Sequence, residues 1–233
     1  MPPSKVTNCS ADRQYAAEAS GDASLRRCVF SHRTVPRDKT TCEVTPMTPD
    51  AFLDILHIAE RLKNTTRHCD TSAGRRESVA EHCWRLGLMA FLLRDQFPAL
   101  DMDKVTQMCL IHDLGEAFTG DRPAFEKTEA DTEREKALYR GWIGTLPEPL
   151  RARFTALCGE MEARTTPEAR LYKALDRLEA LIQHNEADIS TWLPLEYELQ
   201  QTYGLADCAF DPWLKALRQA VLRDSLKKIE EKA

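Results

Sequence analysis

The chain has 233 residues, of which 42% are hydrophobic and 30% are charged, and its formal net charge is -5. This balance is typical of a soluble globular domain, and no apolar run reaches the about 18 residues of a membrane-spanning helix, which excludes an integral membrane protein of that kind. The slightly negative net charge lacks the excess of basic residues that is typical of proteins that bind nucleic-acid polymers. Neither a membrane nor a nucleic acid is therefore an expected partner.

Residues 1–46 mix Ser, Thr, Arg and Pro without a period, which predicts a flexible N-terminal extension before a folded domain over 47–233. The opening residues contain no continuous apolar segment of the kind a secretory signal needs, so a cytoplasmic location is expected. Eight cysteines are scattered without a CxxC pair and are expected to be reduced. Cys83 and Cys109 fall at helical spacing among apolar residues, which predicts that they pack in the core.

The first helix is expected in PDAFLDILHIAERL, with Thr48 as N-cap and Pro49 at the first helical position. A second helix is expected in ESVAEHCWRLGLMAFLLRDQF, because Ser78 and Glu81 form a capping box and apolar residues follow at three- and four-residue steps. The residues of this stripe are Val79, His82, Leu86, Met89 and Leu93. The helix therefore carries a histidine on its apolar side.

A third helix is expected in DMDKVTQMCLIHDLGEAF, where Asp101 is the N-cap. Its stripe of Val105, Met108, Cys109 and His112 ends in a second histidine that faces inward, and Gly115 follows shortly. The Gly- and Pro-containing segment GDRPAFEKT reads as a loop.

Further helices are expected around DTEREKALYRGWI, over roughly 147–163, after the cap pair Thr166 and Pro167, and from near Asp211 onward. No segment alternates with period two as a half-buried strand does, and the chain has only nine glycines. The predicted fold class is all-α, a helical bundle.

A single histidine on an apolar face is more often a hydrogen-bonded core residue than a metal ligand. The adjacent pair His112 and Asp113 changes this balance, because imidazole nitrogen beside carboxylate oxygen is a ligand set for a divalent first-row metal. Neighbours on a helix do not face the same way, so both reach one ion only at a helix edge or where the helix ends. The segment LGEAF that follows makes the helix end plausible.

The motif ESVAEH, followed about thirty residues later by IHDLGEAFTGDRP, resembles the HD-domain phosphohydrolases, in the branch of the bacterial and eukaryotic 5'-deoxynucleotidases. The resemblance extends from LKNTTRH at 62–68 to KALDRLEALIQ at 173–183, more loosely over 48–204, and leaves the last helix outside. It implies an HD-domain helical bundle, activity as a metal-dependent hydrolase of nucleoside 5'-monophosphates in nucleotide metabolism, and a homodimer.

Carried over residue by residue, the resemblance implies that one divalent ion is bound by His82, His112, Asp113 and Asp176. Asp176 lies off the main apolar stripe of its helix, so periodicity alone predicts a solvated side chain there. That helix is apolar nearly all round, which would allow burial on two faces and let Asp176 point into a site. Mixed nitrogen and oxygen ligation suits manganese, cobalt, iron or zinc better than magnesium.

The same resemblance implies that Glu116 and Asp121 are the acid/base carboxylates, which fits the proton handling that phosphate-ester hydrolysis needs. It implies substrate contacts at Arg67, His68, Asp121, Arg122, Pro123 and Ala124. The guanidinium of Arg67 suits a phosphate. For Arg122, a position facing the solvent is an equally good interpretation. His68 stands where some family members have a tryptophan, which leaves selection for a 2'-deoxyribose open.

Two other readings belong to different functional classes. HD-type iron oxygenases that act on phosphonate-like substrates need further histidines for a second metal, and this sequence has none between His112 and His184. The same absence disfavours binuclear HD phosphodiesterases. A non-catalytic metal- or nucleotide-binding regulatory module would have a degraded carboxylate set, but Glu116 and Asp121 are both present.

Overall fold

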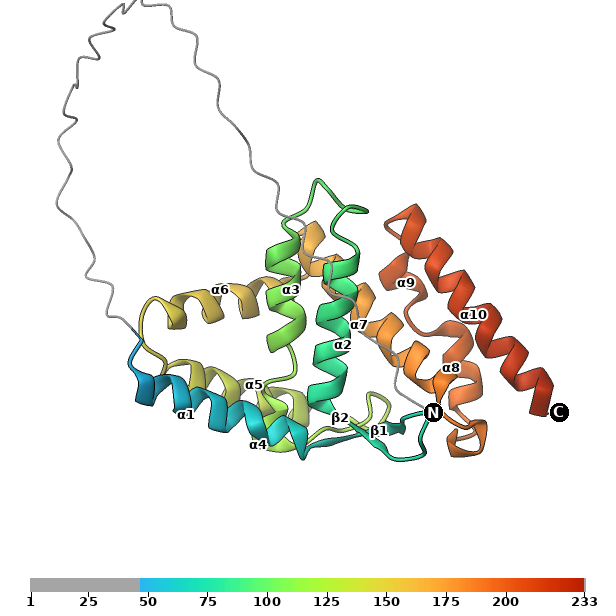
Figure 1. The fold of residues 1–233 in the computed structure, drawn as a ribbon, viewed down its shortest axis with the longest axis horizontal. Helices are drawn as coiled ribbons and strands as arrows, with labels where there is room; N and C mark the ends of the chain where they lie inside the picture. The colour runs from blue at the N-terminus through green and yellow to red at the C-terminus, as the bar shows by residue number, and fades with distance from the viewer. Residues whose placement is uncertain (1–46, 233) are drawn as a thin grey trace, which may run out of the picture. The chain divides into compact units, whose positions relative to one another are not determined.

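The computed structural model describes residues 47–232. This part of the chain is a helical fold with one two-stranded sheet, coloured from blue to red in Figure 1. The element order is α1 (Pro49–Glu60), η1 (Arg61–Lys63), β1 (Thr66–Asp70), β2 (Arg76–Ser78), α2 (Val79–Leu92), α3 (Met102–Ile111), α4 (Glu116–Thr119), α5 (Glu129–Ile143), α6 (Leu150–Ala163), α7 (Pro167–Glu186), η2 (Ile189–Thr191), α8 (Glu196–Thr202), α9 (Leu205–Cys208) and α10 (Pro212–Lys232). The all-α prediction is confirmed.

The helix starts follow the capping residues in the sequence. Thr48 accepts a hydrogen bond from Ala51 N at the start of α1, and Ser78 and Glu81 form the predicted capping box of α2. Asp101 caps α3 and Thr166 caps α7 in the same way. Each cap satisfies backbone N–H groups that have no partner inside the helix, which fixes where the helix begins.

The core forms where α2 and α3 pack side by side and α7 crosses both of them (Figure 1). The apolar stripes predicted for these helices lie inside it, and Cys83 and Cys109 are buried as expected. On its other side α7 contacts α9 and α10, so it is buried on two faces. This double burial is what allows a polar residue off the main stripe to be enclosed.

One prediction about secondary structure is wrong. No strand was expected, but β1 and β2 form an antiparallel hairpin, with Thr66 paired to Ser78 and Asp70 to Arg76. Strands of five and three residues are too short to show a period, and polar residues fill most of their positions. The third helix ends at Ile111, directly before the pair His112 and Asp113, and the short α4 begins at Glu116 within LGEAF.

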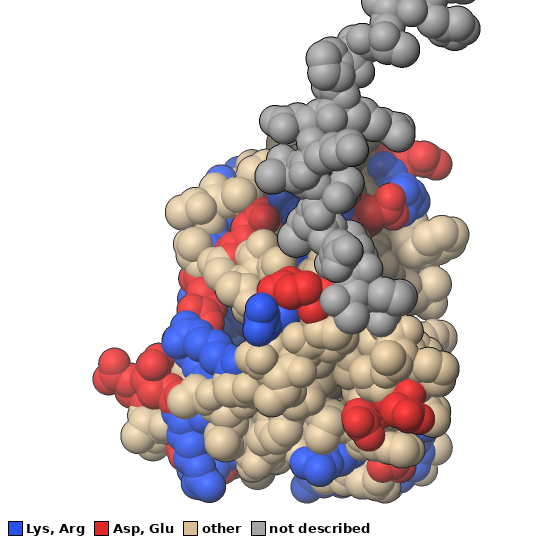
Figure 2. Space-filling model, turned by 90° about the vertical axis from the view of Figure 1, so that its left-hand side faces the viewer, with Lys and Arg blue, Asp and Glu red and all other residues tan. Residues whose placement is uncertain are grey.

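The surface of the described residues carries both charge signs. On the face drawn in Figure 2, basic and acidic side chains lie among one another and among uncharged residues, in keeping with the modest net charge of -5. Among the helices of residues 47–232, none is both long enough and apolar enough to cross a membrane. The expected N-terminal extension, residues 1–46, lies outside the described residues.

Candidate metal centre and its cavity

Four side chains converge beneath a cavity, and they come from α2, the C-terminal end of α3, and α7. His82 Nε2 lies 3.2 Å from His112 Nε2 and 3.2 Å from Asp176 Oδ1. Asp113 Oδ2 lies 3.0 Å from His112 Nε2 and 3.7 Å from His82 Nε2. These are the four residues that the sequence resemblance marks as ligands, and the fold brings all of them together.

The turn after α3 lets two successive residues face one point. His112 is the C-terminal cap of α3, and a turn over residues 112–115 separates α3 from α4, so His112 and Asp113 lie at the end of a helix and not in its middle. The Asp113 side chain is a quarter exposed, whereas that of His112 is almost fully buried. The pair lies at the end of a helix, and the two side chains approach each other to 3.0 Å.

Asp176 is enclosed despite lying off the apolar stripe of α7. Its side chain is 13% exposed, and its Oδ2 accepts a 2.7 Å hydrogen bond from Lys173 Nζ while Oδ1 faces the two imidazoles. Burial opposes the charge of this carboxylate, but Lys173 and the imidazoles outweigh it and hold the pKa of Asp176 well below its usual range. The solvated position suggested by periodicity alone is wrong.

The second nitrogen of each imidazole is held by an oxygen atom. His82 Nδ1 hydrogen-bonds Glu179 Oε2 on α7, and His112 Nδ1 lies 3.0 Å from Cys109 O. Because Nδ1 of each ring is held by these oxygens, Nε2 of each ring is directed toward Asp113 and Asp176. Hydrogen-bonded imidazoles of this kind are pre-oriented for a metal.

The donor set fits one divalent ion. A six-coordinate ion with bonds of about 2.1 Å has neighbouring ligand atoms about 3 Å apart. The two imidazole Nε2 atoms lie 3.0 to 3.7 Å from each other and from the oxygens of Asp113 and Asp176. Within residues 47–232, His82, His112 and Asp113 form one of two groups with the spacing of metal ligands. The second group, Glu77, His82 and Glu179, is filled by the guanidinium of Arg67 and does not suit an ion.

Two further carboxylates border this centre. Glu116, at the start of α4, is almost fully buried, and its Oε2 has no hydrogen-bond partner within the described part of the chain. Burial, with the nearby charges of Asp113 and Asp121, raises the pKa of Glu116 well above its ordinary value. Burial also raises the pKa of Asp121, in the loop after α4. A buried carboxyl with an unused oxygen is suited to hold a water molecule or pass on a proton.

The cavity above the centre has a volume of about 620 Å³. Its walls include every predicted substrate contact: Arg67, His68, Asp121, Arg122, Pro123 and Ala124. Asp113, Glu116 and Asp176 also line it, whereas the two histidines of the centre lie beneath its floor. Arg122 is paired with Asp131 and its side chain is 57% exposed, so it lies at the rim.

The cavity also contains residues that the sequence did not single out. Four further basic residues line it, namely Lys127, Arg164, Lys173 and Arg177. On another part of the wall, His68 Nε2 and His184 Nε2 lie 3.2 Å and 3.5 Å from the same atom, Glu196 Oε1. The ring of Phe125 meets His68 edge-on. Basic lining residues together with a mixed polar and aromatic part of the wall suit a ligand with a phosphate at one end and a ring at the other.

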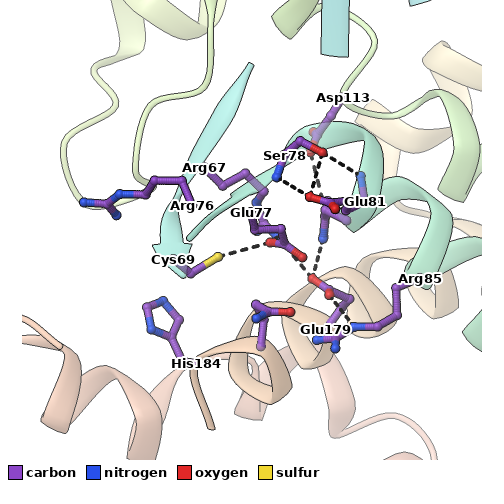
Figure 3. Close-up of polar contacts among 12 residues, drawn as sticks. Arg67, Cys69, Arg76, Glu77, Ser78, Glu81, Arg85, Asp113, Glu179 and His184 are labelled. Atoms are coloured by element: carbon purple, nitrogen blue, oxygen red, sulfur yellow. Dashed lines mark hydrogen bonds and ion pairs between the residues drawn. The ribbon is translucent and has the colours of Figure 1, made fainter. Parts of the chain in front are cut away.

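A buried carboxylate pair below Arg67 was also missed. Glu77 precedes α2 and Glu179 lies on α7, and Figure 3 shows both carboxylates beside Arg67. Charges on His82, Arg67 and Arg85 outweigh burial and lower the pKa of Glu179 to about 2, whereas burial raises the pKa of Glu77. In the sequence, Glu179 stands three residues after Asp176, and that spacing is the only local signal for it.

A family model described as the HD domain matches residues 59–217. The chain belongs to the HD-domain family. The match reaches into α10, so the prediction that the last helix lies wholly outside the family pattern is wrong. A crystal structure described as a predicted metal-dependent phosphohydrolase, from Magnetospirillum magnetotacticum MS-1, is 30% identical to this HD-domain chain with a TM-score of 0.66. The likeness covers 77% of this chain and 95% of that one.

Two curated relatives of this HD-domain chain carry the name 5'-deoxynucleotidase HDDC2. The Danio rerio protein is 36% identical over 112 residues, which cover 47% of this chain and 55% of the relative. The Homo sapiens protein is 31% identical over 140 residues, which cover 58% of this chain and 68% of the relative. The chain thus spans a little over half to two thirds of the length of these relatives.

Proposed function

We propose that the protein is a metal-dependent phosphomonoesterase that hydrolyses nucleoside and deoxynucleoside 5'-monophosphates to nucleoside and phosphate. The observation that carries this proposal is the convergence of two imidazole nitrogens and two carboxylate oxygens beneath a cavity whose lining includes five basic residues besides Arg122 at the rim. The name 5'-deoxynucleotidase of the relatives gives the proposal its substrate class.

In this proposal one divalent ion is bound by His82, His112, Asp113 and Asp176. The bound ion supplies a Lewis acid for a phosphoryl oxygen and a site that lowers the pKa of a water molecule. Two nitrogen and two oxygen ligands suit manganese, cobalt, iron or zinc better than magnesium. The pairing of Lys173 with the second oxygen of Asp176 leaves Oδ1 free to face the ion.

The phosphate is proposed to lie against Arg67, whose planar guanidinium suits phosphoryl oxygens. In the reaction the oxygen of a water molecule attacks phosphorus and the bond to the 5'-oxygen breaks. The proton lost by the water passes to a carboxylate, and the 5'-alkoxide takes up a proton. Glu116 and Asp121 are proposed for these two transfers, because both line the cavity beside Asp113 and the buried Oε2 of Glu116 is unpartnered among the described residues.

The nucleoside is proposed to occupy the part of the cavity beside His68, Phe125 and the loop of Arg122, Pro123 and Ala124. Glu196 and His184 make the wall behind His68 polar. A polar wall gives no reason to exclude a ribose, so the proposed substrates include both sugar types.

The test of this function is phosphate release from matched ribonucleoside and 2'-deoxyribonucleoside 5'-monophosphates. The metal-free protein is first prepared by chelation, and manganese, cobalt, iron, zinc and magnesium are then added one at a time. We expect hydrolysis to stop on chelation and to return with a transition metal more strongly than with magnesium. The proposal is wrong if none of these substrates is hydrolysed with any metal and the protein consumes oxygen in the presence of a phosphonate. In that case the protein is an HD-type oxygenase.

A homodimer is also proposed, and an exposed apolar stripe supports it. Trp84 and Phe91 on α2 are 62% and 61% exposed, and Leu88 and Leu92 extend the same side of the helix. Leu110 of α3 packs over Gly87 and widens the stripe. Contiguous apolar surface of this kind is typical of an interaction site.

Replacing Phe91 with glutamate is expected to convert a dimer to a monomer, because it places a charge in the middle of the stripe. Sedimentation velocity at several protein concentrations measures this change. The matched control is Leu138→Glu on α5, which is 41% exposed and far from the stripe in the sequence. A wild-type protein that stays monomeric at all concentrations would refute the dimer.

A further inference from the structure

Glu179 is a buried carboxylate that the proposed mechanism does not use. We propose that it is a positioning residue that holds both the metal ligand His82 and the phosphate-binding Arg67 through one carboxylate oxygen. The inference rests on the proposed function, because it takes the roles of His82 and Arg67 from there. It adds a physical link between metal binding and phosphate binding.

The contacts of Glu179 are all with charged or ring nitrogen atoms. Its Oε2 accepts from His82 Nδ1 and, at 3.1 Å, from Arg67 Nη1, while its Oε1 accepts from Arg85 Nε at 2.8 Å. The side chain is 0% exposed. Figure 3 shows Glu179 on α7 beneath Glu77, with Arg85 reaching it from α2. A charge in this position has no water to replace a lost partner, so its hydrogen bonds fix its orientation.

One oxygen atom therefore sets the direction of two side chains. At His82 it accepts the Nδ1 proton and turns Nε2 toward the ion. At Arg67, the Nη1 group donates both to Glu179 Oε2 and, at 2.8 Å, to Glu77 Oε2. The Nε and Nη2 groups of Arg67 are then left for a ligand in the cavity. A change at Glu179 Oε2 disturbs both functions at once.

Glu77 provides a matched comparison, since it hydrogen-bonds only Arg67 of the two functional side chains. Its hydrogen-bond partners are Arg67 Nη1 and, at 3.1 Å, Cys69 Sγ. Glu186 provides a second comparison. Like Glu179 it pairs with Arg85, but it lies at the surface. The three substitutions Glu179→Gln, Glu77→Gln and Glu186→Gln each remove one charge and keep the side-chain shape.

The experiment measures two binding constants on the full chain, neither of which depends on turnover. Manganese is titrated into the metal-free protein, and inorganic phosphate is then titrated into the manganese-loaded protein. For Glu179→Gln we expect manganese binding to weaken about 10- to 100-fold, as for other partners of metal-bound histidines, and phosphate binding to weaken as well. For Glu77→Gln we expect weaker phosphate binding with unchanged manganese binding. For Glu186→Gln we expect both constants to be unchanged.

These outcomes separate the inference from the function on which it rests. If the wild-type protein binds no metal, the proposed metal centre is wrong. If it binds manganese and Glu179→Gln binds as tightly, or if Glu77→Gln weakens manganese as much as Glu179→Gln does, the positioning role is wrong. Should Glu179→Gln fail to fold, nitrogen NMR of the zinc-loaded wild type decides: the inference requires a proton on His82 Nδ1, and a proton on Nε2 overturns it.

Discussion

His112→Ala is expected to lose both the bound metal and all measurable phosphatase activity. His112 Nε2 lies within 3.5 Å of His82, Asp113 and Asp176, so its removal takes away one of the four proposed ligands. With the imidazole gone, the remaining donors bind a first-row ion much more weakly. The metal content after dialysis, measured by elemental analysis, and phosphate release report the two losses.

The control for this variant is His57→Ala. His57 lies on α1, is exposed, and has no contact with the centre, so this variant should keep its metal and its activity. Thermal unfolding of both variants in the presence of chelator separates loss of metal from loss of fold. If His112→Ala keeps its metal at the wild-type level, the ion binds at a site that does not include His112.

Glu116→Gln is expected to reduce turnover about 10²- to 10⁴-fold, the usual range for a general acid or base, while metal binding changes little. Glutamine keeps the shape of the buried side chain but cannot take up or give a proton. Glu116 is not one of the four converging ligand atoms, and its Oε2 has no partner among the described residues. Phosphate release under saturating substrate and the metal content of the same sample give the two quantities.

Glu126→Gln, in the exposed part of the loop before α5, is the matched control and should behave as the wild type. Asp121→Asn provides an internal comparison, because Asp121 shares the proposed proton transfers. If Glu116→Gln loses the metal together with activity, Glu116 is a ligand and the proposed division of roles between it and Asp113 fails.

The helices were predictable because their signals are local. A capping residue acts on the next three positions, and apolar stripes repeat within one or two turns, so Thr48, Ser78, Asp101 and Thr166 mark helix starts in the sequence itself. The same holds for the end of α3, where the pair His112 and Asp113 needed a broken helix in order to face one ion. The hairpin escaped prediction because β1 and β2 are stabilised by pairing with each other and not by a repeat.

Asp176 and Glu179 show what only the tertiary structure decided. The two residues lie one turn apart on α7, and the sequence around them is compatible with solvent-facing positions. They became part of the centre because α7 packs against α2 and α3 on one side and α9 and α10 on the other. This packing places Glu179 under both His82 and Arg67, which are 97 and 112 residues away in the sequence.

The sequence by itself determined the helical fold, the helix starts and the inward-facing histidines, because these depend on hydrogen bonds and side-chain spacing within a few residues. The tertiary structure decided which carboxylates meet those histidines, how large the cavity is and that Trp84 and Phe91 lie exposed. These properties depend on the crossing of helices far apart in the chain. Their energies come from burial and charge pairing between segments, for which a local pattern has no signal.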